Sequence, residues 1–120
     1  MITASISKDA NGRIQRFLIQ GHAMHGEAGH DIVCAAVSSL VYTAIASMER
    51  VVKLKPEQYE YQIKSRGQAQ LKLVESKMSP KQAHDAQLVA EVLETGLLGI
   101  AQENGPYIEV RYRRCKNVKI

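Results

Sequence analysis

Two side chains, the thiol of Cys34 and the imidazole of His22, have the chemistry and the spacing needed for nucleophilic catalysis. A thiolate attacks a carbonyl carbon, and a neighbouring imidazole can accept the thiol proton and later protonate the leaving amine. Residues 21–30, which lie around and after His22, contain three glycines and no periodic apolar face, so we expect a loop there. Because such a loop can bring the two side chains together, the pair indicates a cysteine protease dyad.

The residues before Cys34 predict an element that would activate its thiol. Asp31 is a good N-cap, and a helical pattern begins at Ile32 and continues to about Lys53. Cys34 would then lie in the first helical turn, beside amide hydrogens without intrahelical partners and the positive end of the helix dipole. Helix N-termini lower thiol pKa values from about 8.5 to roughly 3.5–7.5. The same amides could stabilise a developing oxyanion.

Two further residues could assist this pair. Asp31 could orient the imidazole of His22, although its capping role would compete for the same carboxylate. Ser38 lies one turn after Cys34 on the same helix face, where it could hydrogen-bond in the site or bind its own backbone carbonyl. A structural interpretation also stays open, because a cysteine at an apolar helix start is often a buried packing residue.

A metal site is the alternative use of this segment. His22, His25, His30 and Cys34 supply four potential zinc ligands. Their spacing, H-x2-H-x4-H-x3-C, matches no structural zinc pattern, and a glycine-rich loop is a poor cage for a metal. We therefore expect neither a metal nor any other cofactor.

Strand and helix patterns alternate in the order β-β-α-β-β-α-β. The first two strands meet at Asn11-Gly12, a strong hairpin signal. The second helix opens at Ser79-Pro80-Lys81-Gln82, where a serine N-cap, a proline and a glutamine form a capping box. The pattern predicts one α+β domain over residues 1–120, a mixed sheet packed by two helices. The predicted strands are 2–7, 13–20, 58–64, 69–75 and 107–113.

Composition excludes several classes of protein. Hydrophobic residues make up 45% of the 120 residues and charged residues 23%, which excludes a wholly disordered chain. The first residues lack a signal-peptide pattern, and no window of about 18 residues is free of polar side chains, so we expect no membrane span. Two cysteines are too few for a disulfide scaffold, which fits a reducing cytoplasm. Cys115 and His84 have no partner visible in the sequence, and we expect both to be non-catalytic.

Basic charge is concentrated near the end of the chain. All 12 acidic residues and 11 of the 16 basic ones lie in residues 1–110, so the net charge of +4 comes from the last ten residues. Such a segment could attract RNA or another anionic partner, although a solvated strand end is the simpler interpretation. The first helix is apolar or small on nearly all sides, which indicates a central helix buried on more than one side or a helix at a subunit interface.

The stretch from Gly21 to Ser38, GHAMHGEAGHDIVCAAVS, resembles the Prp family, the ribosomal-processing cysteine proteases of bacteria. The shared pattern is G-H-A, a spacer and then G-x-D-I-V-C-A-x-V-S, and the order of strands and helices is similar over nearly the whole chain. The resemblance implies that Cys34 is the catalytic cysteine and His22 the catalytic histidine. Further motif positions are filled by Gly21, Asp31 and Ser38.

The resemblance also implies a substrate and an assembly. Prp-like enzymes are homodimers that remove a short N-terminal extension from the large-subunit ribosomal protein L-twenty-seven. Cleavage follows paired aromatic residues, which implies an apolar groove in the enzyme. The loop over the site would have to move for substrate, with Gly26 and Gly29 as its hinges.

Two other functions remain open from the residues alone. One is a non-enzymatic ribosome-associated or RNA-binding module that uses the basic C-terminal segment. The other is a structural dimer in which the glycine-rich loop is only a connector.

Overall fold

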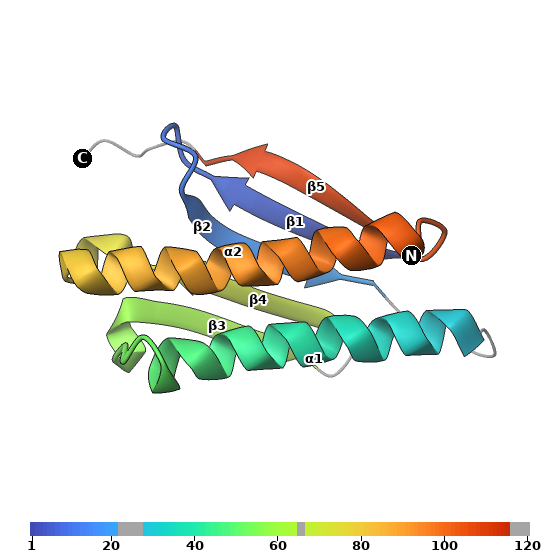
Figure 1. Cartoon of the computed structure of the whole chain (residues 1–120), viewed down its shortest axis with the longest axis horizontal. Helices are drawn as coiled ribbons and strands as arrows, with labels where there is room; N and C mark the ends of the chain where they lie inside the picture. Colours follow the sequence, from blue (N-terminus) through green and yellow to red (C-terminus); the bar gives the residue numbers. More distant parts are fainter. Residues whose placement is uncertain (22–27, 65–66, 116–120) are drawn as a thin grey trace.

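Five strands and two long helices make up the part of the chain that the computed structural model describes, residues 1–21, 28–64 and 67–115 (Figure 1). The helices are α1 (Ala28–Arg50) and α2 (Pro80–Glu103), and two short 3-10 helices, η1 (Pro56–Gln58) and η2 (Glu75–Lys77), flank the second pair of strands. The strands are β1 (Ile2–Lys8), β2 (Ile14–Gln20), β3 (Tyr59–Lys64), β4 (Gln68–Leu73) and β5 (Ile108–Arg114).

The strands form one mixed sheet in the order β3-β4-β2-β1-β5. The pairs β1–β2, β2–β4 and β3–β4 are antiparallel, and β5 joins the edge of β1 in parallel. Both helices lie on the same face of the sheet, α2 and α1 side by side (Figure 1). The predicted α+β architecture, a mixed sheet packed by two helices, is therefore confirmed.

Side-chain alternation along the strands builds the core on the helix-covered face. Phe17 pairs with Ile6 on one side and Leu71 on the other, and all three are almost fully buried. Burial of each such side chain stabilises the fold by about 1.5–3 kcal/mol. β3 lies at the sheet edge, so its residues Tyr61 and Ile63 occupy the same face and yet remain exposed. α2 contributes Ala86, Ala90, Leu93 and Leu97 to the core.

A glycine lets the two helices approach closely. A Cβ atom added to Gly96 of α2 would lie 2.6 Å from Cδ1 of Leu40 in α1. The space that the missing side chain leaves is therefore filled by Leu40, which packs against the core. This contact holds the middle of α1, at Leu40, against α2.

Two local sequence signals are confirmed in detail. Gly12 has a φ of 79° in the β1–β2 turn, and the Asn11 N–H donates to Oδ1 of Asp9 at 2.8 Å. At the start of α2, the Gln82 N–H donates to Oγ of Ser79 at 3.1 Å, and the Ser79 N–H donates to Oε1 of Gln82 at 3.0 Å.

The start of α1 differs from the prediction. α1 begins at Ala28 and ends at Arg50, so it starts before Asp31 and stops short of Lys53. Asp31 lies inside the helix, and the expectation that it is the N-cap is wrong. Gly29 is the second residue of α1 and does not belong to the preceding loop, and its role as a hinge stays a prediction. Packing of the apolar face of α1 on the sheet outweighs the low helix propensity of one glycine.

By length and composition, α1 would also suit a membrane span. Its stretch Ile32–Arg50 has a mean hydropathy of 1.6. The core helix of a water-soluble protein passes the same test, and Val33, Val41 and Met48 of α1 belong to the core of this domain. We interpret α1 as a core helix, and the absence of a membrane span stays a prediction.

Candidate active site

Cys34 lies in the second turn of α1, and its partly buried side chain packs against the hydrophobic core. The neighbouring Val33 and Val37 are 2% and 4% exposed, which anchors this turn on the sheet. Ser38 follows one turn later and is exposed. The thiol therefore lies at the boundary between core and solvent, on a helix held in place by its own core residues.

The helix start cannot activate Cys34 in the way that the sequence suggests. Because α1 begins at Ala28, the amide of Cys34 lies beyond the first four N–H groups, which are the ones without intrahelical partners. The helix dipole also loses its effect within the first turn. The expectation of an oxyanion site formed at Cys34 by free helix-start amides is therefore wrong.

The predicted base, His22, lies outside the described residues, as do His25 and the hinge candidate Gly26. The described chain stops at Gly21 after β2 and resumes at Ala28, the first residue of α1. In Figure 1 the end of β2 leads toward the end of the molecule where α1 begins. Gly21, which follows the end of β2, and Cys34, in the second turn of α1, therefore lie toward the same end of the molecule.

Gly21 has a backbone conformation and an environment that exclude a side chain. Its φ is 138°, and an added Cβ atom would lie 2.4 Å from the carbonyl oxygen of Met1 and 2.7 Å from Cα of Ile2. Its N–H donates to the carbonyl of Gly67 at 3.0 Å. The sequence marks Gly21 only as the residue before His22, whereas the structure shows that it fixes the end of β2 against the start of β1.

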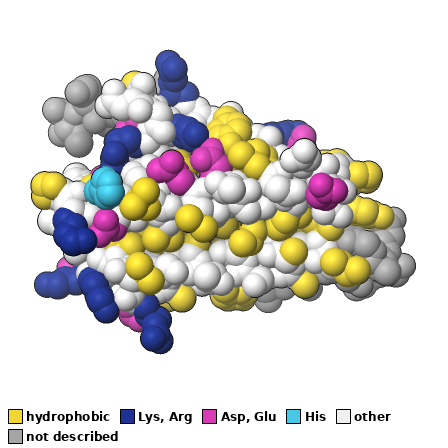
Figure 2. Space-filling view, in the orientation of Figure 1, with side chains coloured by type: hydrophobic (Ala, Val, Ile, Leu, Met, Phe, Trp, Pro, Cys, Tyr) yellow, Lys and Arg dark blue, Asp and Glu magenta, His cyan; other side chains and the backbone are white. Residues whose placement is uncertain are grey.

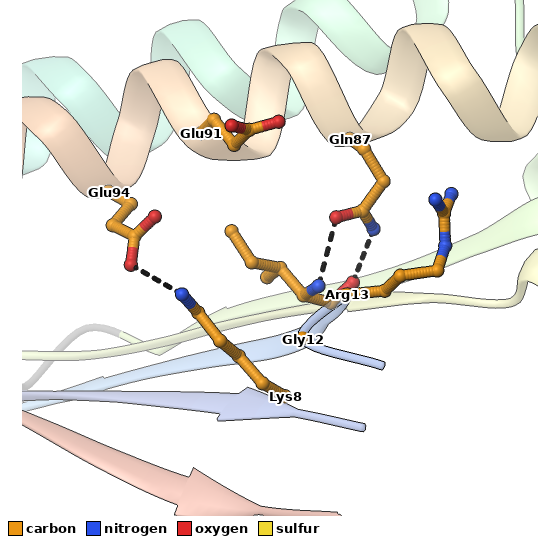
Figure 3. A pocket seen from close by; sticks show the side chains of 7 residues that line it. Lys8, Gly12, Arg13, Gln87, Glu91 and Glu94 are labelled. Atoms are coloured by element: carbon orange, nitrogen blue, oxygen red, sulfur yellow. Dashed lines mark hydrogen bonds and ion pairs between the residues drawn. The ribbon is translucent and has the colours of Figure 1, made fainter. Parts of the chain in front are cut away.

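A second set of polar residues, at the opposite end of β2, lines a cavity of about 210 Å³ (Figure 3). Gln87 of α2 accepts a hydrogen bond from the Ile14 N–H at 2.9 Å and donates one to the Ile14 carbonyl at 2.6 Å. Glu94 pairs with Lys8 at 3.0 Å and accepts a hydrogen bond from the Tyr112 hydroxyl at 2.6 Å. Burial and the bond to Glu94 raise the pKa of Tyr112 to about 12.

A partly buried ion pair completes this end of the molecule. Nε of Arg13 donates to both carboxylate oxygens of Glu75 at 3.1 Å, and Gln15 donates to the same carboxylate at 3.0 Å. Burial alone would raise the pKa of Glu75, but the hydrogen bonds from Arg13 and Gln15 outweigh it, so the pKa is lowered. These residues join the β1–β2 turn to η2 and α2, and we assign them a structural role that sequence reasoning missed.

Neither of the residues that the sequence set aside lies at the Cys34 end. His84 is exposed on the first turns of α2 and contacts Asp85 at 3.2 Å. The backbone N–H of Cys115 donates to the carbonyl of Lys8, at the hairpin end of β1. Among the residues that the structure describes, no three His, Cys, Asp or Glu side chains lie close enough together to hold a metal ion.

The architecture and the placement of Cys34 define a class, a two-layer α+β domain that presents a cysteine from the second turn of a core helix. The family model for cysteine protease Prp matches residues 1–109. The chain therefore belongs to the Prp family of cysteine proteases.

Named relatives agree with this assignment. The chain is 27% identical over 114 residues to the ribosomal processing cysteine protease Prp of Staphylococcus aureus strain Mu50, a match that covers 94% of this chain and all of the relative. The structure is similar to that of SMU.848 from Streptococcus mutans, with a TM-score of 0.81, 25% identity and 96% coverage of each chain.

The S. aureus enzyme has also been solved with peptides. Its complex with a substrate peptide is similar to this structure with a TM-score of 0.76 and 25% identity. Its complex with a covalently linked product peptide gives a TM-score of 0.74 and 26% identity. Both matches cover 94% of this chain and the whole of the S. aureus chain.

Proposed function

We propose that this protein is an endopeptidase that removes the N-terminal extension of the large-subunit ribosomal protein L-twenty-seven, with Cys34 as nucleophile and His22 as general base and acid. The observation that supports this most strongly is the S. aureus relative, which shares the fold over its whole length and has been solved with a covalently linked product peptide. A cysteine at the surface boundary of a fixed core helix fits a nucleophile that forms such a bond.

The chemistry follows from one thiol and one imidazole. His22 takes the proton of Cys34, and the sulfur attacks the scissile carbonyl carbon to form a C–S bond. The C–N bond then breaks, and the imidazolium gives its proton to the departing amine. Water, deprotonated by His22, attacks the thioester, the C–S bond breaks, and the new carboxylate leaves.

Each supporting residue has a separate part in this proposal. Gly21 fixes the strand end from which His22 continues. Ser38, exposed one turn beyond Cys34, is placed to hydrogen-bond to substrate. Asp31 lies on the same helix before Cys34 and would hold the imidazole in one orientation.

A homodimer in the cytoplasm is the second part of the proposal. No charged residue lies between Asp31 and Glu49, and the outer face of α1 leaves Ile32 70% and Tyr42 55% exposed. An apolar helix face of this kind is covered in stable assemblies. Sedimentation velocity should give a dimer that Tyr42→Glu converts to a monomer, and a monomer at every concentration would contradict the dimer.

The test of the activity is incubation of the purified protein with a peptide that carries the extension and its junction, read by mass spectrometry. We expect one cleavage, which Cys34→Ala abolishes. Cys115→Ala is the matched control, because the second cysteine lies at the other end of the molecule, and it should cleave like the wild type. Full cleavage by Cys34→Ala would remove Cys34 from the mechanism.

A further inference from the structure

The face of the sheet that the helices leave uncovered carries an unusual set of charges. Strand register places Glu60, Lys72, Arg16, Ser7 and Arg113 in one row across β3, β4, β2, β1 and β5. Because side chains alternate along a strand, this row points away from the helices, opposite to Phe17 and Leu71. Arg111 lies on the same face two residues before Arg113.

We call Arg16, Lys72, Arg111 and Arg113 the basic sheet face. Lys72, Arg111 and Arg113 are exposed, and Arg16 is half-buried. Between the two arginines, Ser7 has a small, buried side chain, so the longer basic side chains flank it on both sides. The basic side chains thus come from three strands, β4, β2 and β5, and lie on either side of Ser7 of β1.

The charges of the basic sheet face are only partly compensated. Arg16 and Lys72 are direct cross-strand partners, an arrangement that is unfavourable for like charges. Within the described ranges, no carboxylate lies within 4.0 Å of the charged groups of Arg16, Lys72 or Arg113, whereas Arg111 pairs with Glu109 at 2.7 Å. Glu60 of β3 is the other cross-strand partner of Lys72 and offsets part of this repulsion, so the excess of basic charge lies mainly around Arg16 and Arg113.

Arg16 also has hydrogen-bond donors to spare. Its Nη2 donates to Oε1 of Gln70 at 3.2 Å, while its Nε is buried and has no hydrogen-bond partner among the described residues. A guanidinium carries five N–H donors in a planar fork that suits phosphate oxygens. An anionic ligand beside Arg16 and Lys72 would relieve the repulsion between them.

We propose that the basic sheet face binds the phosphate backbone of RNA. The face is flat and polar, and Leu18 is its one large apolar residue within the described strands, so it lacks the aromatic and apolar anchors typical of protein interfaces. Arginine and lysine without aromatic side chains for base stacking favour sequence-independent phosphate contacts. Repulsion between like charges argues against a second copy of this chain on the same face.

The position of the basic sheet face separates it from catalysis. Arg111 and Arg113 follow residue 109, where the match to the protease family model ends. Arg16, Lys72 and Arg113 lie on the face opposite to that packed by α1, which carries Cys34. RNA bound there would hold the enzyme near a ribonucleoprotein substrate while leaving the helix side accessible.

The test compares two charge-matched triple variants of the full chain. One is Arg16→Gln, Lys72→Gln and Arg113→Gln on the basic sheet face. The other is Arg50→Gln, Lys55→Gln and Lys77→Gln, three exposed residues outside this face. The probe is an unstructured fluorescent RNA of about 20 nucleotides, titrated across NaCl concentrations by anisotropy.

We expect salt-dependent binding by the wild type. The sheet-face variant should bind at least about tenfold more weakly at low salt, with a salt slope smaller by about 2, because each phosphate contact to a single strand contributes about 0.7. The charge-matched control should bind within about threefold of wild type. Both variants should cleave the precursor peptide at the wild-type rate.

Three results would overturn the proposal. They are no binding of RNA by the wild type, equal weakening by the two variants, and binding of a poly-glutamate peptide in preference to RNA. The last result would assign the face to an acidic protein. Since peptide cleavage is measured separately, loss of RNA binding and failure of the protease assignment are distinguishable.

Discussion

The two ends of β2 are built on different principles. At the hairpin end, polar side chains hold the backbone, since Gln87 bonds to both peptide groups of Ile14 and Arg13 pairs with Glu75. At the other end, Gly21 holds its place because it has no side chain, and its backbone packs against Met1. The hydrogen bonds and ion pair at the hairpin end stabilise the fold. The close packing at Gly21 fixes the residue that directly precedes the predicted catalytic His22.

This difference indicates that the residues that stabilise the fold and the residues that support the predicted reaction lie at opposite ends of β2. Changes at the hairpin end should alter the free energy of unfolding and spare the reaction. Changes at the Gly21 end should alter the reaction, either directly or through the position of His22. The predictions below test that separation.

The largest effect should come from the predicted base. His22→Ala should lower kcat/KM for the precursor peptide at least about 1000-fold, because the thiol loses its proton acceptor and the leaving amine its donor. Thermal unfolding should be unchanged. His84→Ala, an exposed histidine on α2, is the control and should be fully active. Wild-type activity of His22→Ala would contradict the assignment of the catalytic base to the Gly21 end of β2.

Gln87→Ala should destabilise the fold by about 2–6 kcal/mol, since it leaves the Ile14 N–H and carbonyl unsatisfied at about 1–3 kcal/mol each. Urea unfolding measures this, and kcat of the folded fraction should stay at the wild-type value. Gln102→Ala, on the exposed face of the same helix, should change stability by less than about 0.5 kcal/mol. Equal effects of the two substitutions would contradict the structural role.

Gly21→Ala should lower the free energy of unfolding by about 1–3 kcal/mol, because alanine is strained at a φ of 138° and its Cβ would overlap the Met1 carbonyl. Unlike Gln87→Ala, it should also lower kcat, as the strand end before His22 shifts. Gly99→Ala in α2 is the control, since an added Cβ meets nothing within 4 Å there. Wild-type stability and activity of Gly21→Ala would show that the close approach is unimportant.

The smallest expected effect is a change in how the free energy of unfolding depends on pH. The folded-state pKa of Glu75 is lowered, so its carboxylate stabilises the fold above the unfolded carboxyl pKa of about 4.3, and this contribution is lost as the pH falls through the folded value. Glu75→Gln should therefore flatten the fall of stability in acid, measured by urea unfolding at a series of pH values. Glu103→Gln, an exposed carboxyl at the end of α2, should leave the wild-type curve in place. A wild-type acid profile in Glu75→Gln would contradict the ion pair.

Short-range sequence signals predicted much of the fold. Asn11-Gly12 and the Ser79 capping box specify their backbone locally, and both were confirmed. The start of α1 was placed too late, because Asp31 is a good cap and Gly29 a poor helix former, and tertiary packing outweighed both. The link from Gln87 to Ile14 joins residues far apart in the chain, and no local pattern indicates it.

For the candidate site, the sequence supplied residue types and the structure supplied part of the positions. Cys34 lies on a core helix as expected, but not in its first turn. The roles of His22, Asp31 and Ser38 stay predictions. A helix boundary that moves by three or four residues removes one of the two predicted sources of thiol activation, the helix-start amides, and leaves the predicted nucleophile and its imidazole base unchanged.

The most direct test is therefore the rate at which iodoacetamide alkylates Cys34 across pH, followed by peptide mass mapping, with Cys115 in the same molecule as the internal reference. We predict that Cys34 reacts at lower pH than Cys115, and that His22→Ala removes this difference. Identical pH profiles of the two cysteines in the wild type would contradict an activated thiolate at Cys34.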